Sequence, residues 1–144
     1  MINSRRLEDL HPRVRVKAEA LKAQCDEEGI DIIFTSTLRD NECQQELYNK
    51  GRTAESIAKK ERKVTNAKPG QSYHNWGVAF DVVPIVNGKA IWNDSKVWAR
   101  IGAIGVSLGL EWAGNWKRFK EMPHFQFTNG LTLKDFQSGK TLSS

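Results

Sequence analysis

The chain has 144 residues, of which 39% are hydrophobic and 27% are charged, proportions that are typical of a globular domain with its own hydrophobic core. No apolar run approaches the ~20 residues that a membrane-spanning helix needs, and the first residues lack the apolar segment of a secretory signal. We therefore expect one domain over residues 1–144, made in the cytoplasm without a signal peptide and without a membrane span.

The formal net charge is +5, and a positive surface favours contact with negatively charged polymers. No nucleic-acid-binding motif accompanies this charge, so the pattern favours anionic polymers or head groups of a cell envelope over DNA or RNA. The two cysteines, Cys25 and Cys43, lack the neighbours of a zinc cluster and are expected to be buried free thiols. Nothing in the sequence indicates an obligate oligomer, so we expect a monomer.

The first part of the chain predicts two helices around one strand. A helix begins at Pro12 and ends before Gly29, a residue suited to a C-terminal cap; its apolar stripe contains Val14, Ala18, Leu21 and Cys25. Residues 30–36 are β-branched and apolar, which predicts a strand. Asp40 is suited to cap the next helix, which Gly51 ends.

Residues 52–71 are polar and rich in lysine. A connection of this length in a compact domain is usually functional or mobile. We therefore expect this long polar loop to form one lip of a cleft, with a short helix near residues 54–60.

The second part of the chain predicts short strands around one long helix. Residues 77–83 are typical of a buried strand, which Pro84 interrupts, and Asn87-Gly88 predicts a hairpin turn. The further expected elements are a helix capped by Asn93 or Asp94 and closed by Gly109, strands over residues 110–112 and 124–127, a short helix from Thr132 to Phe136, and a frayed tail over residues 138–144. This mixture lacks a regular βαβ pattern and favours an α+β fold, a small antiparallel sheet with helices packed against it.

Two of the three histidines, His74 and His124, lie in the stretches with the strongest chemical signal. Asp81 falls inside the apolar strand, where an unpaired charge is costly and a metal ion would remove the difficulty. Two histidines and one carboxylate suit a catalytic zinc ion, which keeps a further position for water. Glu121, three residues before His124, is then placed to act as the catalytic base on that water.

The segment that carries the second histidine is expected to be extended. Pro123 disfavours a helix interior, so Glu121 and His124 do not share a helix face. Side chains of a strand alternate between its two faces. His124 and Gln126 are therefore expected to face a cleft, while Phe125 and Phe127 enter the core.

Each of these residues also has an ordinary structural interpretation. Spacing alone leaves a His/Asp/His set more often structural than metal-binding. Glu111 is an alternative base, although it lies further from His124 in sequence than Glu121 does. Arg39, just after a strand, suits either a carboxylate of a substrate or a surface salt bridge. Trp116 suits either a substrate contact or an anchor for its own loop.

A spaced pattern around the first of these histidines resembles the zinc site of the M15 peptidases, the VanY or D-Ala-D-Ala carboxypeptidase-like family; its residues are Ser72, His74, Gly77, Ala79 and Asp81. The block from Gly109 to Gln126 is similar to the L-alanyl-D-glutamate endopeptidase branch, which includes single-domain phage endolysins. The resemblance extends from Leu10 to about Leu133. Ala113 stands where the family often has glycine, which leaves the shape of that loop open but not the chemistry.

The resemblance implies a Hedgehog/DD-peptidase-type fold and a Zn2+ cofactor. It implies that zinc is held by His74, Asp81 and His124 and that Glu121 is the catalytic base. It also implies substrate contacts, for which the candidates are Arg39, Ser72, Gln44 and Trp116.

The function that follows is zinc-dependent hydrolysis of the peptidoglycan stem peptide, at the L-alanyl-D-glutamate bond, by a phage endolysin that lyses its host. Such an enzyme reaches the cell wall after release by a holin-type route, and no separate wall-binding domain is expected. Two alternatives stay open. A D-Ala-D-Ala carboxypeptidase of the same family would release free D-Ala, and a non-catalytic wall-binding module would keep its function in a Glu121→Ala variant.

Overall fold

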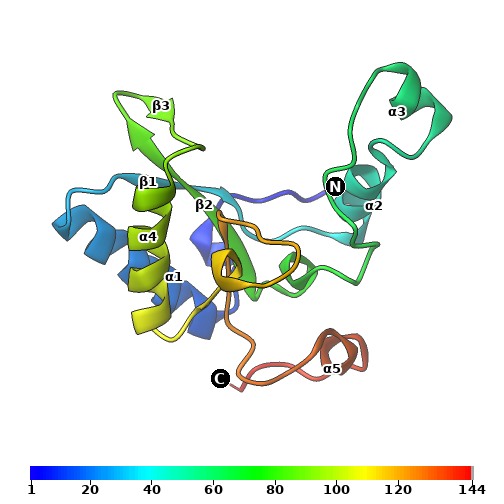
Figure 1. Cartoon of the computed structure of the whole chain (residues 1–144). Helices are drawn as coiled ribbons and strands as arrows, with labels where there is room; N and C mark the ends of the chain where they lie inside the picture. Colours follow the sequence, from blue (N-terminus) through cyan, green and yellow to red (C-terminus); the bar gives the residue numbers. More distant parts are fainter. Residues whose placement is uncertain (144) are drawn as a thin grey trace.

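The structure, a computed structural model, describes residues 1–143 (Figure 1). Its helices are α1 (Pro12–Glu27), α2 (Asn41–Asn49), α3 (Ala54–Ala58), α4 (Ser95–Ser107) and α5 (Leu133–Gln137). Its strands are β1 (Ile32–Ser36), β2 (Ala79–Val86), β3 (Lys89–Ala90), β4 (Glu111–Trp112) and β5 (His124–Gln126). Short 3-10 turns are η1 (Leu7–Asp9), η2 (Tyr73–Trp76) and η3 (Ala113–Asn115). No helix within residues 1–143 is both long enough and apolar enough to cross a membrane.

The strands form one antiparallel sheet in the order β1-β2-β5-β4, and β3 pairs with the far end of β2 as a hairpin. The register between β2 and β5 sets Asp81 directly opposite His124 and Phe80 opposite Phe125. Because successive side chains of a strand point to opposite faces, the two polar residues and the two rings lie on different faces of the sheet. The rings of Phe80 and Phe125 stack in the core with their centroids 5.8 Å apart.

Helices α1 and α4 pack against each other and against the sheet, which closes the hydrophobic core (Figure 1). Two interior glycines of α4 make this close approach possible. The ring of Trp112 lies against Gly102 and the ring of Phe125 lies against Gly105, so that a Cβ atom at either glycine would overlap the ring.

The antiparallel sheet with packed helices confirms the predicted α+β fold, and local signals placed most elements correctly. Asp40 and Asp94 accept backbone N–H groups at the start of α2 and α4. Asn87 and Gly88 both have positive φ in the hairpin turn, as a two-residue turn of this type requires.

The prediction that Pro84 interrupts the second strand is wrong, since β2 continues through it to Val86. Pro84 pairs with Ile32, and the neighbouring N–H of Ile85 donates to Asp31 instead. The proline nitrogen therefore points away from β1, at a place beyond the end of β5, where no ladder hydrogen bond is lost. The strand also begins at Ala79 and not at residue 77.

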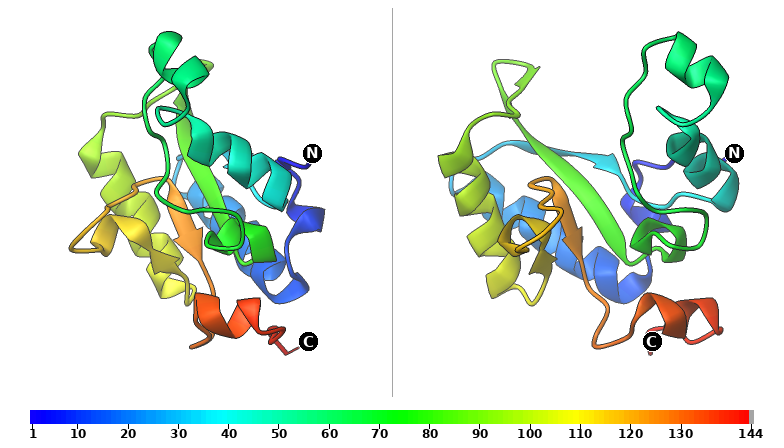
Figure 2. Two further views of the ribbon diagram at one scale, coloured as in Figure 1. Left: turned by 90° about the vertical axis from the view of Figure 1, so that its right-hand side faces the viewer. Right: turned by 45° about the vertical axis from the view of Figure 1, so that its right-hand side comes forward.

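The predicted frayed tail, residues 138–144, is anchored where the structure describes it, and Ser144 lies outside the described residues. Leu142 is only 5% exposed and belongs to the hydrophobic core. Arg13 Nη1 donates to Ser143 Oγ at 3.0 Å. By contrast, the predicted short helix in the long polar loop is confirmed as α3, which projects beyond α2 and away from the sheet (Figure 2).

Candidate metal centre

The central strand delivers the carboxylate of the centre. Asp81 lies between Phe80 and Val82, which are fully buried on the core face of β2. Alternation turns the Asp81 carboxylate to the opposite face. There, Oδ1 lies 3.2 Å from one nitrogen of each of His74 and His124.

His74 is held in position by the short turn η2. Ser72 caps this turn by accepting the backbone N–H of His74, and Gly77 closes it with a φ of 68°. A left-handed residue is needed there, and glycine adopts it without strain. The turn leaves the His74 ring buried, with Nδ1 2.8 Å from the carbonyl oxygen of Thr37 and Nε2 facing Asp81.

His124 begins β5 and faces Asp81 across the sheet register. Its Nδ1 lies 3.2 Å from Asp81 Oδ1, and its Nε2 lies 2.8 Å from Gln126 Oε1. Gln126 is two residues further along the strand and points to the same face, as the alternation predicts. The expectation that His124 and Gln126 face the cleft while Phe125 enters the core is confirmed. Phe127 is only partly buried and packs against the core from outside.

The donor set fits one divalent metal ion. The three ligand atoms of His74, Asp81 and His124 all lie within 4.8 Å of one another. The Thr37 carbonyl and the Gln126 amide oxygen only accept hydrogen bonds, so each neutral ring carries its proton on the outer nitrogen. Two ring lone pairs and a carboxylate oxygen therefore converge, which is the chemistry that zinc binds.

The pKa shifts of the three residues in the absence of a metal ion are consistent with a cation-binding site. Burial would raise the pKa of Asp81, but the two histidines outweigh burial and hold that pKa well below its usual value. Burial lowers the pKa of His74, and Asp81 offsets this only in part. Burial also opposes the charged form of His124, yet its hydrogen bond to Asp81 raises the net pKa. The ionised carboxylate thus attracts a proton onto its neighbour, at the place where a cation would bind.

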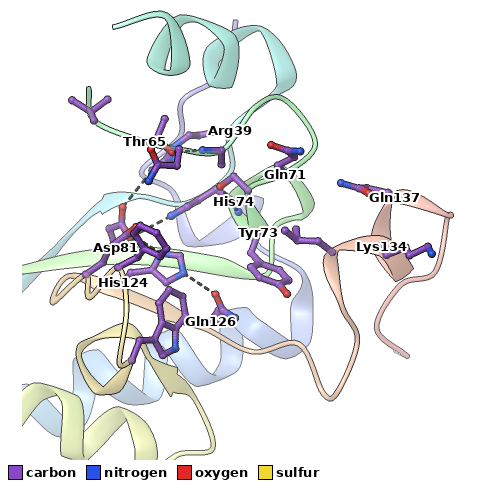
Figure 3. A pocket seen from close by; sticks show the side chains of 18 residues that line it. Arg39, Thr65, Gln71, Tyr73, His74, Asp81, His124, Gln126, Lys134 and Gln137 are labelled. Atoms are coloured by element: carbon purple, nitrogen blue, oxygen red, sulfur yellow. Dashed lines mark hydrogen bonds and ion pairs between the residues drawn. The ribbon is translucent and has the colours of Figure 1, made fainter. Parts of the chain in front are cut away.

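A cavity of about 750 Å³ opens directly over the three residues (Figure 3). Figure 3 shows His74, Asp81 and His124 pointing toward one another. The long polar loop lines one side of the cavity through residues 64–67. The segment before His124 contributes Trp116, Phe119 and Glu121. Helix α5 contributes a third wall that the sequence did not indicate, through Leu133, Lys134 and Gln137.

Glu121 lies at the edge of this cavity, next to the three residues. Its Oε2 is 3.9 Å from His124 Nδ1, and its side chain is 60% exposed. The rival carboxylate, Glu111, does not line the cavity and instead accepts hydrogen bonds from Gln126 and Thr128. The geometry therefore favours Glu121 over Glu111 as the group that reaches a bound substrate.

The four predicted substrate contacts divide into two groups. Arg39, Ser72 and Trp116 line the cavity, and the Trp116 ring centroid lies 5.7 Å from that of His124. Gln44 is fully buried and does not line the cavity. It accepts a hydrogen bond from Arg39 and donates one to Ala67, so its place is behind the guanidinium and under the loop.

Comparison with known proteins decides the family. A family model described as VanY, D-alanyl-D-alanine carboxypeptidase, matches residues 7–129. The chain belongs to the VanY family. The resemblance read from the sequence motifs is thereby confirmed.

Two relatives of this VanY-family chain are named for one activity. It is 42% identical over 127 residues to the peptidoglycan L-alanyl-D-glutamate endopeptidase CwlK of Bacillus subtilis (strain 168), covering 82% of this chain and 73% of CwlK. It is 28% identical over 139 residues to the L-alanyl-D-glutamate peptidase of Listeria phage A118, covering 94% of this chain. The match spans only 44% of that phage protein.

Solved structures agree on the fold of this VanY-family chain. The L-Ala D-Glu endopeptidase ChiX of Serratia marcescens superposes with a TM-score of 0.61 at 25% identity, covering 90% of this chain and 86% of ChiX. A vancomycin-resistance D,D-pentapeptidase VanY in complex with Zn(II) superposes with a TM-score of 0.64 at 20% identity, covering 89% and 83%. The second likeness supports the DD-peptidase-type fold alone.

Proposed function

We propose that the chain is a zinc-dependent peptidoglycan hydrolase that cleaves the L-alanyl-D-glutamate bond of the stem peptide. The observation that carries the proposal is the convergence of His74, Asp81 and His124 beneath a cavity that Glu121 borders. The 42% identity to CwlK supports the choice of bond. The three converging residues would hold the metal.

Zinc, when bound in such a site, polarises a carbonyl oxygen and lowers the pKa of a water molecule toward neutrality. The chain's own residues supply the rest of the reaction. Glu121 takes a proton from the attacking water and returns it to the nitrogen of the leaving D-glutamate. Its exposed carboxylate, beside the centre but not among the three converging residues, suits this exchange of protons.

Arg39 is the group we assign to holding the peptide. Its guanidinium donates to Ser36 at 3.1 Å, to Gln44 at 3.2 Å and to Asp81 at 3.4 Å. A guanidinium has five N–H groups, so these contacts fix its plane and leave donors for a carbonyl or carboxylate of the substrate. Ser72 and Trp116, which also line the cavity, complete the proposed substrate contacts.

The positive charge of the chain is concentrated in residues 59–68 and 116–121, which we call the cationic lips; each segment contributes residues to the cavity wall. Together they hold eight basic and two acidic residues, whereas the remaining chain holds 14 basic and 15 acidic residues. We propose that the cationic lips contact anionic polymers of the cell envelope.

A charge-neutralised triple variant tests the cationic lips. Replacing Lys117, Arg118 and Lys120 by glutamine is expected to weaken salt-sensitive binding to isolated cell walls. The matched control replaces three exposed cations elsewhere, Arg5, Lys89 and Lys96, by glutamine. Equal loss in both variants would contradict a specific role of the lips.

The biological setting we propose is host lysis by a phage, which the similarity to the Listeria phage peptidase supports. In this setting residues 1–144 act as one monomeric peptidase domain that reaches the wall through a holin. Co-expression in a bacterium tests this: lysis that requires both the chain and a holin is expected, and lysis by the chain alone would contradict the route.

A second function is favoured by one observation, the description of the matching family model as a D-alanyl-D-alanine carboxypeptidase. Product analysis separates the two. Purified peptidoglycan is digested, and new amino ends and released amino acids are identified by mass spectrometry. New D-glutamate amino ends that disappear with a chelator are expected, whereas free D-Ala would assign the carboxypeptidase activity. Wall binding without any product would favour the non-catalytic module.

A further inference from the structure

We infer that Glu111 is a positioning residue that acts through Gln126 to fix which ring nitrogen of His124 carries the proton, so that the nitrogen facing the metal centre keeps its lone pair. The inference rests on the proposed function insofar as the centre holds a metal ion. The three side chains form one hydrogen-bonded chain. Gln126 Nε2 donates to Glu111 Oε2 at 3.0 Å, and Gln126 Oε1 lies 2.8 Å from His124 Nε2.

The donor and acceptor roles along these hydrogen bonds follow from the chemistry of the Glu111 carboxylate. An ionised carboxylate only accepts hydrogen bonds, so the Gln126 amide must turn its NH2 group toward Glu111. Its oxygen then faces His124 and also only accepts. The neutral ring must therefore carry its proton on Nε2, which leaves the Nδ1 lone pair directed at Asp81 and the centre.

Because Gln126 and His124 are buried, contacts within the protein and not solvent set the orientation of the Gln126 amide. Gln126 is 4% exposed and His124 is 6% exposed, so water cannot readily replace a lost partner. If the Gln126 amide turned over, its NH2 group would face the ring and favour a proton on Nδ1, where the metal would bind. Groups behind a metal ligand commonly fix its tautomer and orientation in this way.

The other histidine of the centre is oriented by a different device. His74 Nδ1 faces the backbone carbonyl of Thr37, which no side-chain substitution removes. His124 depends on a side-chain amide, which has no preferred direction of its own and is turned by Glu111. The orientation of His124 therefore depends on Glu111, the exposed first residue of β4, and a substitution there can test it.

The first variant is Glu111→Gln, whose amide can offer either its oxygen or its NH2 group to Gln126. We expect the Zn2+ affinity of the full chain, measured by competition with a chromophoric chelator, to fall about 10- to 100-fold. Long-range 1H–15N NMR spectra of the metal-free chain, at a pH where the ring is neutral, are expected to show a single Nε2–H tautomer of His124 in the original chain. The variant is expected to show a mixture of tautomers.

The second variant exchanges the two groups, Glu111→Gln together with Gln126→Glu. It keeps the net charge and sets a carboxylate directly on the Nε2–H of His124. Zn2+ affinity and the single tautomer are expected to return to near the original values. Thr128→Val is the matched control, because it removes the other hydrogen bond to Glu111 and leaves the hydrogen bonds from Glu111 through Gln126 to His124 intact. No change in Zn2+ affinity or in the tautomer of His124 is expected.

Unchanged Zn2+ affinity and an unchanged tautomer in Glu111→Gln would overturn the inference. Absence of rescue in the exchanged variant, with thermal unfolding of the metal-free chain unaltered, would overturn it as well. A chain that takes up no Zn2+ at all would instead contradict the proposed function. The tautomer of the metal-free chain would still decide the role of Glu111 in that case.

Discussion

Single buried polar residues hold the cavity in shape, and Gln44 is the clearest of them. Its amide oxygen accepts a hydrogen bond from Arg39 at 3.2 Å, and its NH2 group donates to the carbonyl of Ala67 at 2.8 Å. Gln44 thereby connects two residues that line the cavity. We predict that Gln44→Leu lowers the free energy of unfolding by about 1–3 kcal/mol, because both partners lose a buried hydrogen bond. Urea denaturation measures the change. The exposed neighbour Gln45, replaced by leucine, is expected to change stability by less than about 0.5 kcal/mol, and equal effects would contradict the role of Gln44.

The two thiols give a second prediction for single residues. Burial raises the pKa of Cys25 to about 11 and also raises the pKa of Cys43. Only the thiolate reacts readily, and it forms as the pH rises toward the pKa, so both cysteines are expected to react slowly at pH 8. An aromatic disulfide reagent should label them rapidly only after urea is added. Rapid labelling of the folded chain would contradict their burial.

Some residues of the site could be predicted from the sequence, and others could not. Asp81 was predictable because a charge is costly inside its apolar strand, and His74 and His124 were assigned with it through the resemblance to the M15 zinc site. Thr37 was not, because it acts through its backbone carbonyl, which every residue has. Gln44 was expected at the substrate and lies behind Arg39, since burial depends on the loop that covers it 23 residues later.

At the scale of elements, helix α4 depends on its glycines. The Phe125 ring lies against Gly105, so a Cβ atom there must displace the ring or the helix. We predict that Gly105→Ala lowers the free energy of unfolding by about 1–3 kcal/mol, although alanine alone favours a helix by about 1 kcal/mol. Thermal or urea unfolding measures it. Val106→Ala, at an exposed position of the same helix, should be neutral or slightly stabilising; a stabilising Gly105→Ala would contradict the packing.

Element boundaries were predictable from the sequence where residues close in sequence determine them. Capping by Asp40 and Asp94 and the Asn87-Gly88 turn depend on neighbours in sequence, and all were predictable. The continuation of β2 through Pro84 was not, because it depends on which edge of the strand β1 occupies. The anchoring of Leu142 likewise depends on a core that only the folded chain creates.

At the scale of the whole molecule, the proposed binding of a metal ion would be coupled to folding. An ion that binds only the folded chain stabilises it by about 2.7 kcal/mol at a hundred times its dissociation constant. For a domain of this size we predict that saturating Zn2+ raises the unfolding midpoint by about 5–10 °C. Differential scanning calorimetry measures the shift. His74→Ala should abolish it, and an equal shift in that variant would place the metal elsewhere.

The central claim is that three residues hold the metal while Glu121 transfers the proton. The direct measurement is hydrolysis of purified peptidoglycan by Glu121→Gln, with bound zinc determined on the same sample. We predict a rate lower by about 100-fold or more, the size of a general acid–base contribution, with the zinc content of the original chain. An unreduced rate at full zinc content, or a loss of zinc together with activity, would contradict the assignment.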